Sequence, residues 1–84
     1  FPCLALAFKA CQVGKTMPAV LNAANEVAVN AFLKEEISFS DIPRIVRSTM
    51  DSHTVLADPA LSDIIEADRH ARKKAADLIR DINQ

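Results

Sequence analysis

The stretch at residues 18–34, PAVLNAANEVAVNAFLK, decides the fold class of this chain of 84 residues. Its apolar side chains return every three or four positions, which is the period of one face of an α-helix. That face consists of Val20, Ala24, Val27, Ala28, Ala31 and Phe32. The alanines are small enough to let neighbouring helix axes approach near the short end of the usual distance of about 8–10 Å. The stretch therefore predicts a helix in the middle of a bundle.

Four polar side chains interrupt this apolar helix, Asn22, Asn25, Glu26 and Asn30, and the first three are the unusual group. Asparagine has a low helix propensity, so two of them among alanines and valines call for a reason. Two interpretations stay open from the residues. Either the side chains face water, or they form hydrogen bonds with another helix, linker or domain, because buried amides are retained only when they are bonded. Under the second interpretation, Asn22, Asn25 and Glu26 are candidate interdomain contacts.

A first helix is predicted over residues 2–13. Pro2 suits the first helical position, where its missing N–H costs no hydrogen bond. Gly14, the single glycine, stands where a left-handed residue closes a helix. The predicted buried stripe consists of Leu4, Ala7, Phe8 and Cys11.

The first helix also carries both cysteines of the chain, Cys3 and Cys11. On one helix their Cα atoms lie about 12 Å apart, at a rise of ~1.5 Å per residue. A disulfide needs a separation below about 7 Å, so the two cannot pair with each other. Two unpaired cysteines suit a reducing compartment, and we expect both to be small, buried apolar groups.

A third helix is predicted to begin at Ser40, as its N-cap, with Asp41 at the positive end of the helix dipole. Pro43 then falls at the third helical position, where the N–H groups have no acceptor within the helix. The apolar stripe consists of Ile42, Ile45, Val46, Thr49 and Met50, and it fades at residues 51–54.

Residues 52–57 are predicted to connect the third helix to a fourth. Asp58 and Pro59 indicate the opening of that helix, with Asp58 as its cap, and Ser62 is an alternative cap. The helix then continues to Ile82. Its apolar stripe consists of Leu61, Ile64, Ala67, Ala71, Ala75, Leu78 and Ile82. The sequence therefore predicts an all-α fold, a small bundle of four helices.

The composition agrees with helices and excludes several classes of protein. With 50% apolar but 5% aromatic residues and one glycine, the chain has too little turn chemistry for a many-stranded barrel or sandwich. A net charge of -1 gives no strong attraction to nucleic acid or to a membrane surface. No run of about 18 apolar residues is present to span a bilayer. The chain begins at Phe1 and not at Met, so we expect residues 1–84 to be one domain cut from a longer protein.

Catalytic and metal-binding patterns are not found in the sequence. Glu35 and Glu36 form an acidic doublet at a helix end, and such doublets are usually exposed, with no converging site around them. His53 and His70 each lack a histidine four positions away, so the helical two-histidine zinc pattern is missing. We expect His53 at a loop or helix end and His70 on a charged face.

Two further clusters have a simpler interpretation than nucleotide or nucleic-acid binding. Residues 14–16, Gly-Lys-Thr, match the end of a phosphate-binding loop, but that motif needs a preceding strand and a glycine where Lys9 stands. A helix cap followed by a turn is favoured instead. Residues 72–74, Arg-Lys-Lys, are interleaved with Asp68 and Asp77 and lack aromatic neighbours, which favours a solvated helix face.

Residues 17–29, MPAVLNAANEVAV, with FPCL at 1–4 and AFL at 31–33, resemble the C-terminal region of the 1-deoxy-D-xylulose 5-phosphate (DXP) reductoisomerase family. The resemblance continues in order through ISF at 37–39, DIPRIV at 41–46 and IEAD at 65–68. It covers almost the whole chain. One difference is Glu35, which stands just after the second helix where the family often has glycine.

The resemblance implies a fragment of an NADPH-dependent enzyme of isoprenoid biosynthesis. Enzymes of this family rearrange and reduce DXP to 2-C-methyl-D-erythritol 4-phosphate with NADPH and a divalent cation, Mg²⁺ or Mn²⁺. They are homodimers of the bacterial cytoplasm or of plastids, with a dinucleotide-binding domain, a central catalytic domain and a C-terminal helical bundle. The family's cation, phosphate and nucleotide ligands lie outside that bundle. The resemblance therefore implies no catalytic, cofactor-binding or metal-binding residue in this chain.

We expect the bundle to pack on the remaining domains of the same enzyme and to help hold the catalytic cleft in shape. The isolated fragment is predicted to bind no NADPH and to turn over no substrate. The residues alone leave an alternative of another class, a stand-alone helical module that docks on a partner or dimerises. A fragment severed from its parent exposes an apolar face, so self-association of the fragment is a further expectation.

Overall fold

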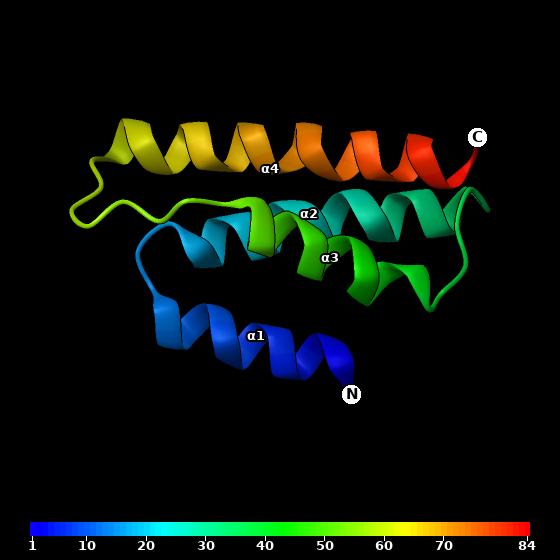
Figure 1. Cartoon of the computed structure of the whole chain (residues 1–84), viewed down its shortest axis with the longest axis horizontal. Helices are drawn as coiled ribbons and strands as arrows, with labels where there is room; N and C mark the ends of the chain where they lie inside the picture. The colour runs from blue at the N-terminus through cyan, green and yellow to red at the C-terminus, as the bar shows by residue number, and fades with distance from the viewer.

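The chain forms four α-helices and no strand in the computed structural model, which describes all residues 1–84. The helices are α1 (Pro2–Val13), α2 (Met17–Leu33), α3 (Asp41–Ser52) and α4 (Leu61–Ile82) (Figure 1). The predicted all-α fold class is therefore confirmed. The bounds of α1 are those predicted, α2 is displaced by one residue, and the end of α4 at Ile82 is also as predicted.

Helix α2 occupies the middle of the bundle, as its alanines predict. It packs against each of the other three helices, and its contact with α4 is the most extensive one in the domain. Helix α1 packs on α2 and α3, whereas α4 packs on the same two helices from the other side (Figure 1). Helices α1 and α4 do not touch each other. The domain therefore has two opposite outer faces, one formed by α1 and the other by α4.

The core is built largely from small side chains. It contains 17 buried apolar residues. Eight of them are alanines: Ala10, Ala23, Ala24, Ala28, Ala31, Ala67, Ala71 and Ala75. Helix α3 supplies the larger groups, and every member of its predicted stripe is buried. Close approach of α2 and α4 follows because both helices turn alanines inward.

The end of α2 is closed by a residue of unfavourable type. Glu35 has a φ of 60°, in the left-handed region that glycine adopts without strain. The N–H of Glu35 donates to the carbonyl oxygen of Phe32, and the N–H of Glu36 donates to that of Ala31, both at 2.9 Å. This pair of hydrogen bonds is the Schellman arrangement. The position at which the resemblance leads us to expect glycine thus has a backbone conformation that favours glycine.

The prediction for the buried face of α1 was wrong. Leu6 and Ala10 face the core, whereas Leu4 and Phe8 are 56% and 64% exposed. Apolar residues surround this helix, so a spacing of three or four can be drawn along more than one face, and packing against α2 and α3 selects between them. The expectation that both cysteines are buried was also wrong, because Cys3 and Cys11 are exposed, free thiols.

The turn after α1 uses two residues with positive φ. Gly14 has φ 68° and ψ −154°, a combination that essentially only glycine adopts. Lys15, with φ 57°, is the left-handed residue of the turn. The prediction that Gly14 adopts the left-handed helical conformation was therefore wrong, because its ψ angle lies in another region. That region also requires a glycine. The N–H of Gly14 donates to the carbonyl oxygen of Ala10 (2.8 Å) and ends the helix.

The predicted start of α4 was wrong as well. Neither Asp58 nor Ser62 is the cap, since the helix begins at Leu61 and Ala60 occupies the N-cap. The Asp63 carboxylate accepts a hydrogen bond from the Ala60 N–H (2.9 Å), which favours this later start. The stripe is buried at its centre, but Leu61 and Ile82 at its ends are 73% and 44% exposed.

Helix α3 begins where predicted but is held differently. Ser40 is the N-cap residue, yet its side chain makes no capping hydrogen bond. Asp41 instead accepts from the Ser38 N–H (2.9 Å) and hydroxyl (2.8 Å). These bonds lower the pKa of the Asp41 carboxyl below its usual value. Pro43 lies at the third helical position, as predicted.

Candidate functional site

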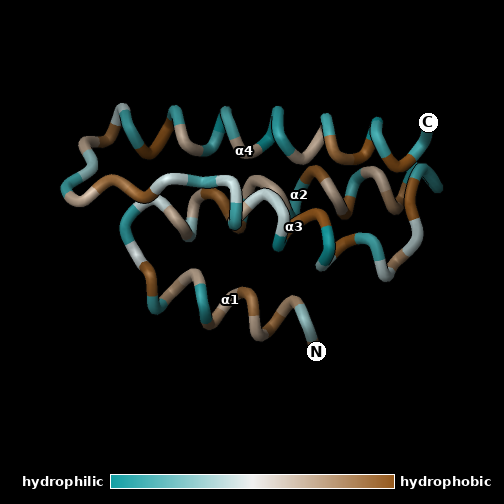
Figure 2. The backbone as a smooth tube through the Cα atoms, viewed as in Figure 1, coloured by the Kyte–Doolittle hydropathy of each residue, from teal (hydrophilic) through white to brown (hydrophobic).

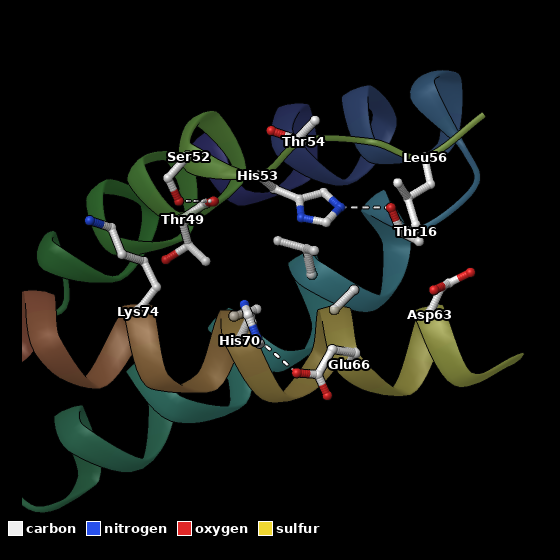
Figure 3. A pocket seen from close by; sticks show the side chains of 13 residues that line it. Thr16, Thr49, Ser52, His53, Thr54, Leu56, Asp63, Glu66, His70 and Lys74 are labelled. Carbon is white, nitrogen blue, oxygen red and sulfur yellow. Dashed lines mark hydrogen bonds and ion pairs between the residues drawn. The ribbon is translucent and has the colours of Figure 1, made fainter. Parts of the chain in front are cut away.

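A hollow of the domain lies between α4 and the segment that follows α3 (Figure 3). Its volume is about 520 Å³. His53 projects into it from the end of α3, whereas Glu66, His70 and Lys74 project from α4 (Figure 3). Both histidines of the chain line this hollow, and a pair of titratable side chains in a cavity is a candidate for catalytic chemistry.

His53 is tied to the buried end of the neighbouring helix. Its Nε2 and the Oγ1 of Thr16 are joined by a hydrogen bond of 2.6 Å, and Thr16 is 1% exposed. Partial burial lowers the pKa of His53, and the nearby charge of His70 lowers it further. The segment is held a second time, because Lys15 Nζ donates to the Ala57 carbonyl oxygen (3.0 Å). His53 therefore fastens the α3–α4 connection to the start of α2.

His70 lies on a charged face, as predicted. Its Nε2–H donates to Glu66 Oε1 (2.8 Å), and the same carboxylate accepts from Arg69 Nε (3.1 Å). The hydrogen bond from Arg69 is the main cause that lowers the pKa of Glu66. No group of three His, Cys, Asp or Glu side chains is arranged to hold a metal ion. The one hydroxyl bonded to a histidine in this hollow is that of Thr16, which is 1% exposed, so the hollow presents no accessible nucleophile beside a base.

The polar residues of α2 are all exposed in this chain, but they are not equivalent. Asn22 Nδ2 donates to Glu26 Oε2 (2.9 Å), and Arg72 of α4 donates to the same oxygen (3.1 Å). Arg72 also donates to Asp68 (2.7 Å). Asn25 forms no such side-chain bond. The structure therefore joins Asn22 and Glu26 in a network across α2 and α4, and leaves Asn25 apart.

The remaining clusters have the simple roles predicted for them. Arg72 and Lys73 form ion pairs with neighbouring acids of α4, the latter with Asp77 at 3.2 Å, as on a solvated face. Residues 14–16 form a helix end and a turn, and the amine of Lys15 is engaged by a backbone carbonyl. None of the four helices combines the length and apolar content that crossing a membrane requires.

Sequence reasoning missed the bond between Thr16 and His53. The two residues are 37 positions apart, and neither one belongs to a motif that names the other. Thr16 precedes α2 and resembles a helix cap in sequence, yet its side chain makes no capping bond. The sequence offered one signal, a threonine and a histidine that each lie at the end of a predicted helix. That signal does not predict that the two side chains form a hydrogen bond with each other.

Comparison with known proteins decides the family. The family described as the DXP reductoisomerase C-terminal domain matches residues 1–74. This chain belongs to that family. The chain is 58% identical over 79 residues to the 1-deoxy-D-xylulose 5-phosphate reductoisomerase of Desulfosudis oleivorans, covering 94% of this chain and 21% of the relative. The corresponding enzyme of Pelotomaculum thermopropionicum is 58% identical over 82 residues, covering 98% and 21%.

A solved structure shares the fold of this reductoisomerase domain. It is the Zymomonas mobilis 1-deoxy-D-xylulose 5-phosphate reductoisomerase in complex with NADPH, with 46% identity and a TM-score of 0.86. The match covers 94% of this chain and 21% of that one. The chain thus spans about a fifth of the length of the reductoisomerases it matches.

Proposed function

We propose that residues 1–84 are the C-terminal structural domain of an NADPH-dependent DXP reductoisomerase, which forms 2-C-methyl-D-erythritol 4-phosphate. The domain packs on the remaining domains of the same subunit and supports the catalytic cleft without an active site of its own. The observation that carries this proposal is the match over 94% of this chain to only 21% of a reductoisomerase. The parent is expected to be a homodimer of the bacterial cytoplasm or of a plastid.

The residues of this chain do not fit the parent's cofactor or cation. A nucleotide pyrophosphate needs a glycine-rich turn before a helix, and the chain has one glycine, in the turn after α1. A divalent cation such as Mg²⁺ or Mn²⁺ needs several oxygen ligands, and no acidic cluster is arranged to supply them. We therefore assign NADPH and the cation to the part of the parent outside this chain.

A chimeric enzyme tests the supporting role. The matched 79 residues of the Desulfosudis oleivorans reductoisomerase are replaced by this chain, and consumption of NADPH with DXP is measured. The chimera should be active, and the same enzyme truncated before the matched segment should lose activity. Full activity of the truncated enzyme would refute the proposal. Calorimetry on the 84-residue chain should give no heat with NADPH, and measurable binding would also contradict it.

The polar residues Asn22, Asn25 and Glu26 are proposed as interdomain contacts. Asn25 carries the clearest form of the proposal because its exposed amide lacks a partner within the domain, whereas Asn22 and Glu26 bond each other. In the chimera, Asn25→Leu should preserve helix content but lower the melting temperature of the whole enzyme. Asn30→Leu, at another exposed position of α2, is the matched control. Equal melting temperatures for the two variants would make this assignment wrong.

A further inference from the structure

Helix α1 is apolar around its whole circumference. Among its 12 residues, only Lys9 has a charged side chain, and only Gln12 has an uncharged polar one. The side that faces the core carries Leu6 and Ala10. The outer side carries a second apolar stripe, formed by Phe1, Leu4, Phe8 and Cys11 and called here the outer stripe. A helix that is apolar all round is normally covered on all sides.

The position of α1 does not match its composition. Helix α2 is similarly apolar, and it is covered by three neighbours. Helix α1 lies at the edge of the bundle and touches two helices, both on its inner side (Figure 2). In the outer stripe, Phe8 is 64% exposed and Phe1 is fully exposed. Helix α1 thus has the composition of an inner helix and the place of an outer one.

The opposite edge of the domain has the chemistry of a surface in water. The outer side of α4 pairs its charges along the helix, as between Arg69 and Glu66, Lys73 and Asp77, and Arg80 and Asp77. Such pairs at spacings of three and four are typical of a solvated helix face. Figure 2 shows the same contrast, with hydrophilic positions recurring along α4 and hydrophobic ones along α1. Leu61, Ile65 and Ile82 of α4 are exposed as well, but paired charges lie between them, whereas no member of the outer stripe has a charged side chain.

The rest of the reductoisomerase subunit is the partner that could cover the apolar outer stripe of α1. The matched segment is 21% of the Desulfosudis oleivorans enzyme, and the family is described as a C-terminal domain. The rest of such a subunit, about four fifths of its length, lies outside the matched segment, and a C-terminal domain follows other domains in the chain. The N-terminal end of the domain lies at the start of α1 (Figure 1), and Phe1 at that end belongs to the outer stripe.

We propose that the outer stripe of α1 is the surface on which the preceding domains of the same reductoisomerase subunit dock, through an apolar patch of their own. This proposal rests on the proposed function, because it needs a parent subunit, and it specifies which face of the bundle that subunit covers. Burial of Phe8 and Leu4 in this contact removes from water the apolar area that the bundle itself leaves open.

Cys11 is a reporter built into the outer stripe. It is an exposed free thiol in this chain, so a maleimide should modify it readily. In the chimeric full-length enzyme, modification of Cys11 should slow by about tenfold or more, because the reagent must wait for the contact to open. An Ala76→Cys variant places the control thiol on an exposed position of α4 and should react alike in both proteins. Mass spectrometry of the modified peptides separates these sites from other cysteines.

A matched pair of substitutions tests the energetics. Phe8 and Ile65 are 64% and 61% exposed, on α1 and α4 respectively. In the chimera, Phe8→Glu should lower the melting temperature and restore modification of Cys11, whereas Ile65→Glu should change neither. The reverse pattern would assign docking to α4 and overturn the proposal.

Two further outcomes keep this proposal separate from the proposed function. Rapid modification of Cys11 in an active chimera would refute docking at the outer stripe and leave the supporting role intact. Full activity of the truncated enzyme would refute the supporting role whatever the state of Cys11. Protection of Cys11 in the chimeric enzyme that rises with protein concentration would assign the stripe to a second copy, and would also overturn the proposal.

Discussion

Replacement of Glu35 by glycine should stabilise the domain. Glu35 closes α2 with a φ of 60°, and its N–H and that of Glu36 both complete hydrogen bonds that require this geometry. A side chain in the left-handed region costs roughly 1–2 kcal/mol, because its Cβ crowds the backbone. Glycine removes that cost but adds about 0.5–1 kcal/mol of backbone freedom to the unfolded state. The net gain expected for Glu35→Gly is therefore about 1 kcal/mol.

Two controls separate backbone strain from other effects of this substitution. Glu35 lies beyond the C-terminus of α2, where a negative charge is unfavourable, so Glu35→Gln measures the contribution of charge alone. Glu36→Gly introduces glycine at the next residue, which does not have a positive φ, and it should not stabilise the chain. Both positions are exposed, so neither control disturbs the core.

Thermal and urea unfolding of the 84-residue chain, followed by circular dichroism, measure the effect. A gain of about 1 kcal/mol corresponds to a rise of about 4–8 °C in the melting temperature of a domain this small. If Glu35→Gly proves no more stable than Glu35→Gln, the strain assigned to this residue is wrong. A gain of the same size in Glu36→Gly would equally contradict the reasoning, because it would not depend on φ.

Three further predictions concern the packing and the histidine. Ala75 is completely buried, so Ala75→Leu should overpack the inner side of α4 and destabilise by about 1–3 kcal/mol in urea unfolding, whereas Ala76→Leu on the exposed side should stay within about 0.5 kcal/mol of the parent chain. Thr16→Val removes the hydrogen bond to His53 and should cost about 1 kcal/mol by the same measurement, and an unchanged urea midpoint would show that the bond contributes nothing. Burial lowers the pKa of His53, so the unfolded chain binds more protons than the folded chain near pH 6. The contribution of neutral His53 to the free energy of unfolding should therefore be fully present above about pH 6.5 and decrease as the pH drops below it. His53→Gln should flatten this dependence between pH 7.5 and 5.5, and an undiminished slope would place the titrating group elsewhere.

The sequence predicts α3 correctly and α1 incompletely for one physical reason. Polar and apolar residues of α3 fall on opposite sides, so only one orientation buries Ile45 and Val46. Helix α1 has no such contrast, and its length and bounds could be predicted while its buried face could not. Packing of α1 against α2 and α3 buries Leu6 and leaves Leu4 exposed, and the spacing of apolar residues within α1 does not contain this information.

The remaining differences arise where a local signal competes with a bond made elsewhere. Asp58 and Pro59 resemble a helix start, but the Asp63 carboxylate bonds the Ala60 N–H and the helix begins there. The hollow beside α4 could not be predicted, because its lining comes from α2, α3, the α3–α4 connection and α4, which only the packed fold brings together. The polar residues of α2 were recognised as unusual, yet the bond of Glu26 to Arg72 joins two helices far apart in sequence.

The alanine contact between α2 and α4 has a mechanical consequence for the domain. An alanine side chain has no rotamers, so it loses no rotational entropy when the two helices come together. For the same reason, Ala71 and its neighbours cannot reorient to absorb a displacement of one helix against the other. A force on α1 is therefore expected to move α2 and α4 together as one rigid unit, without sliding one helix along the other.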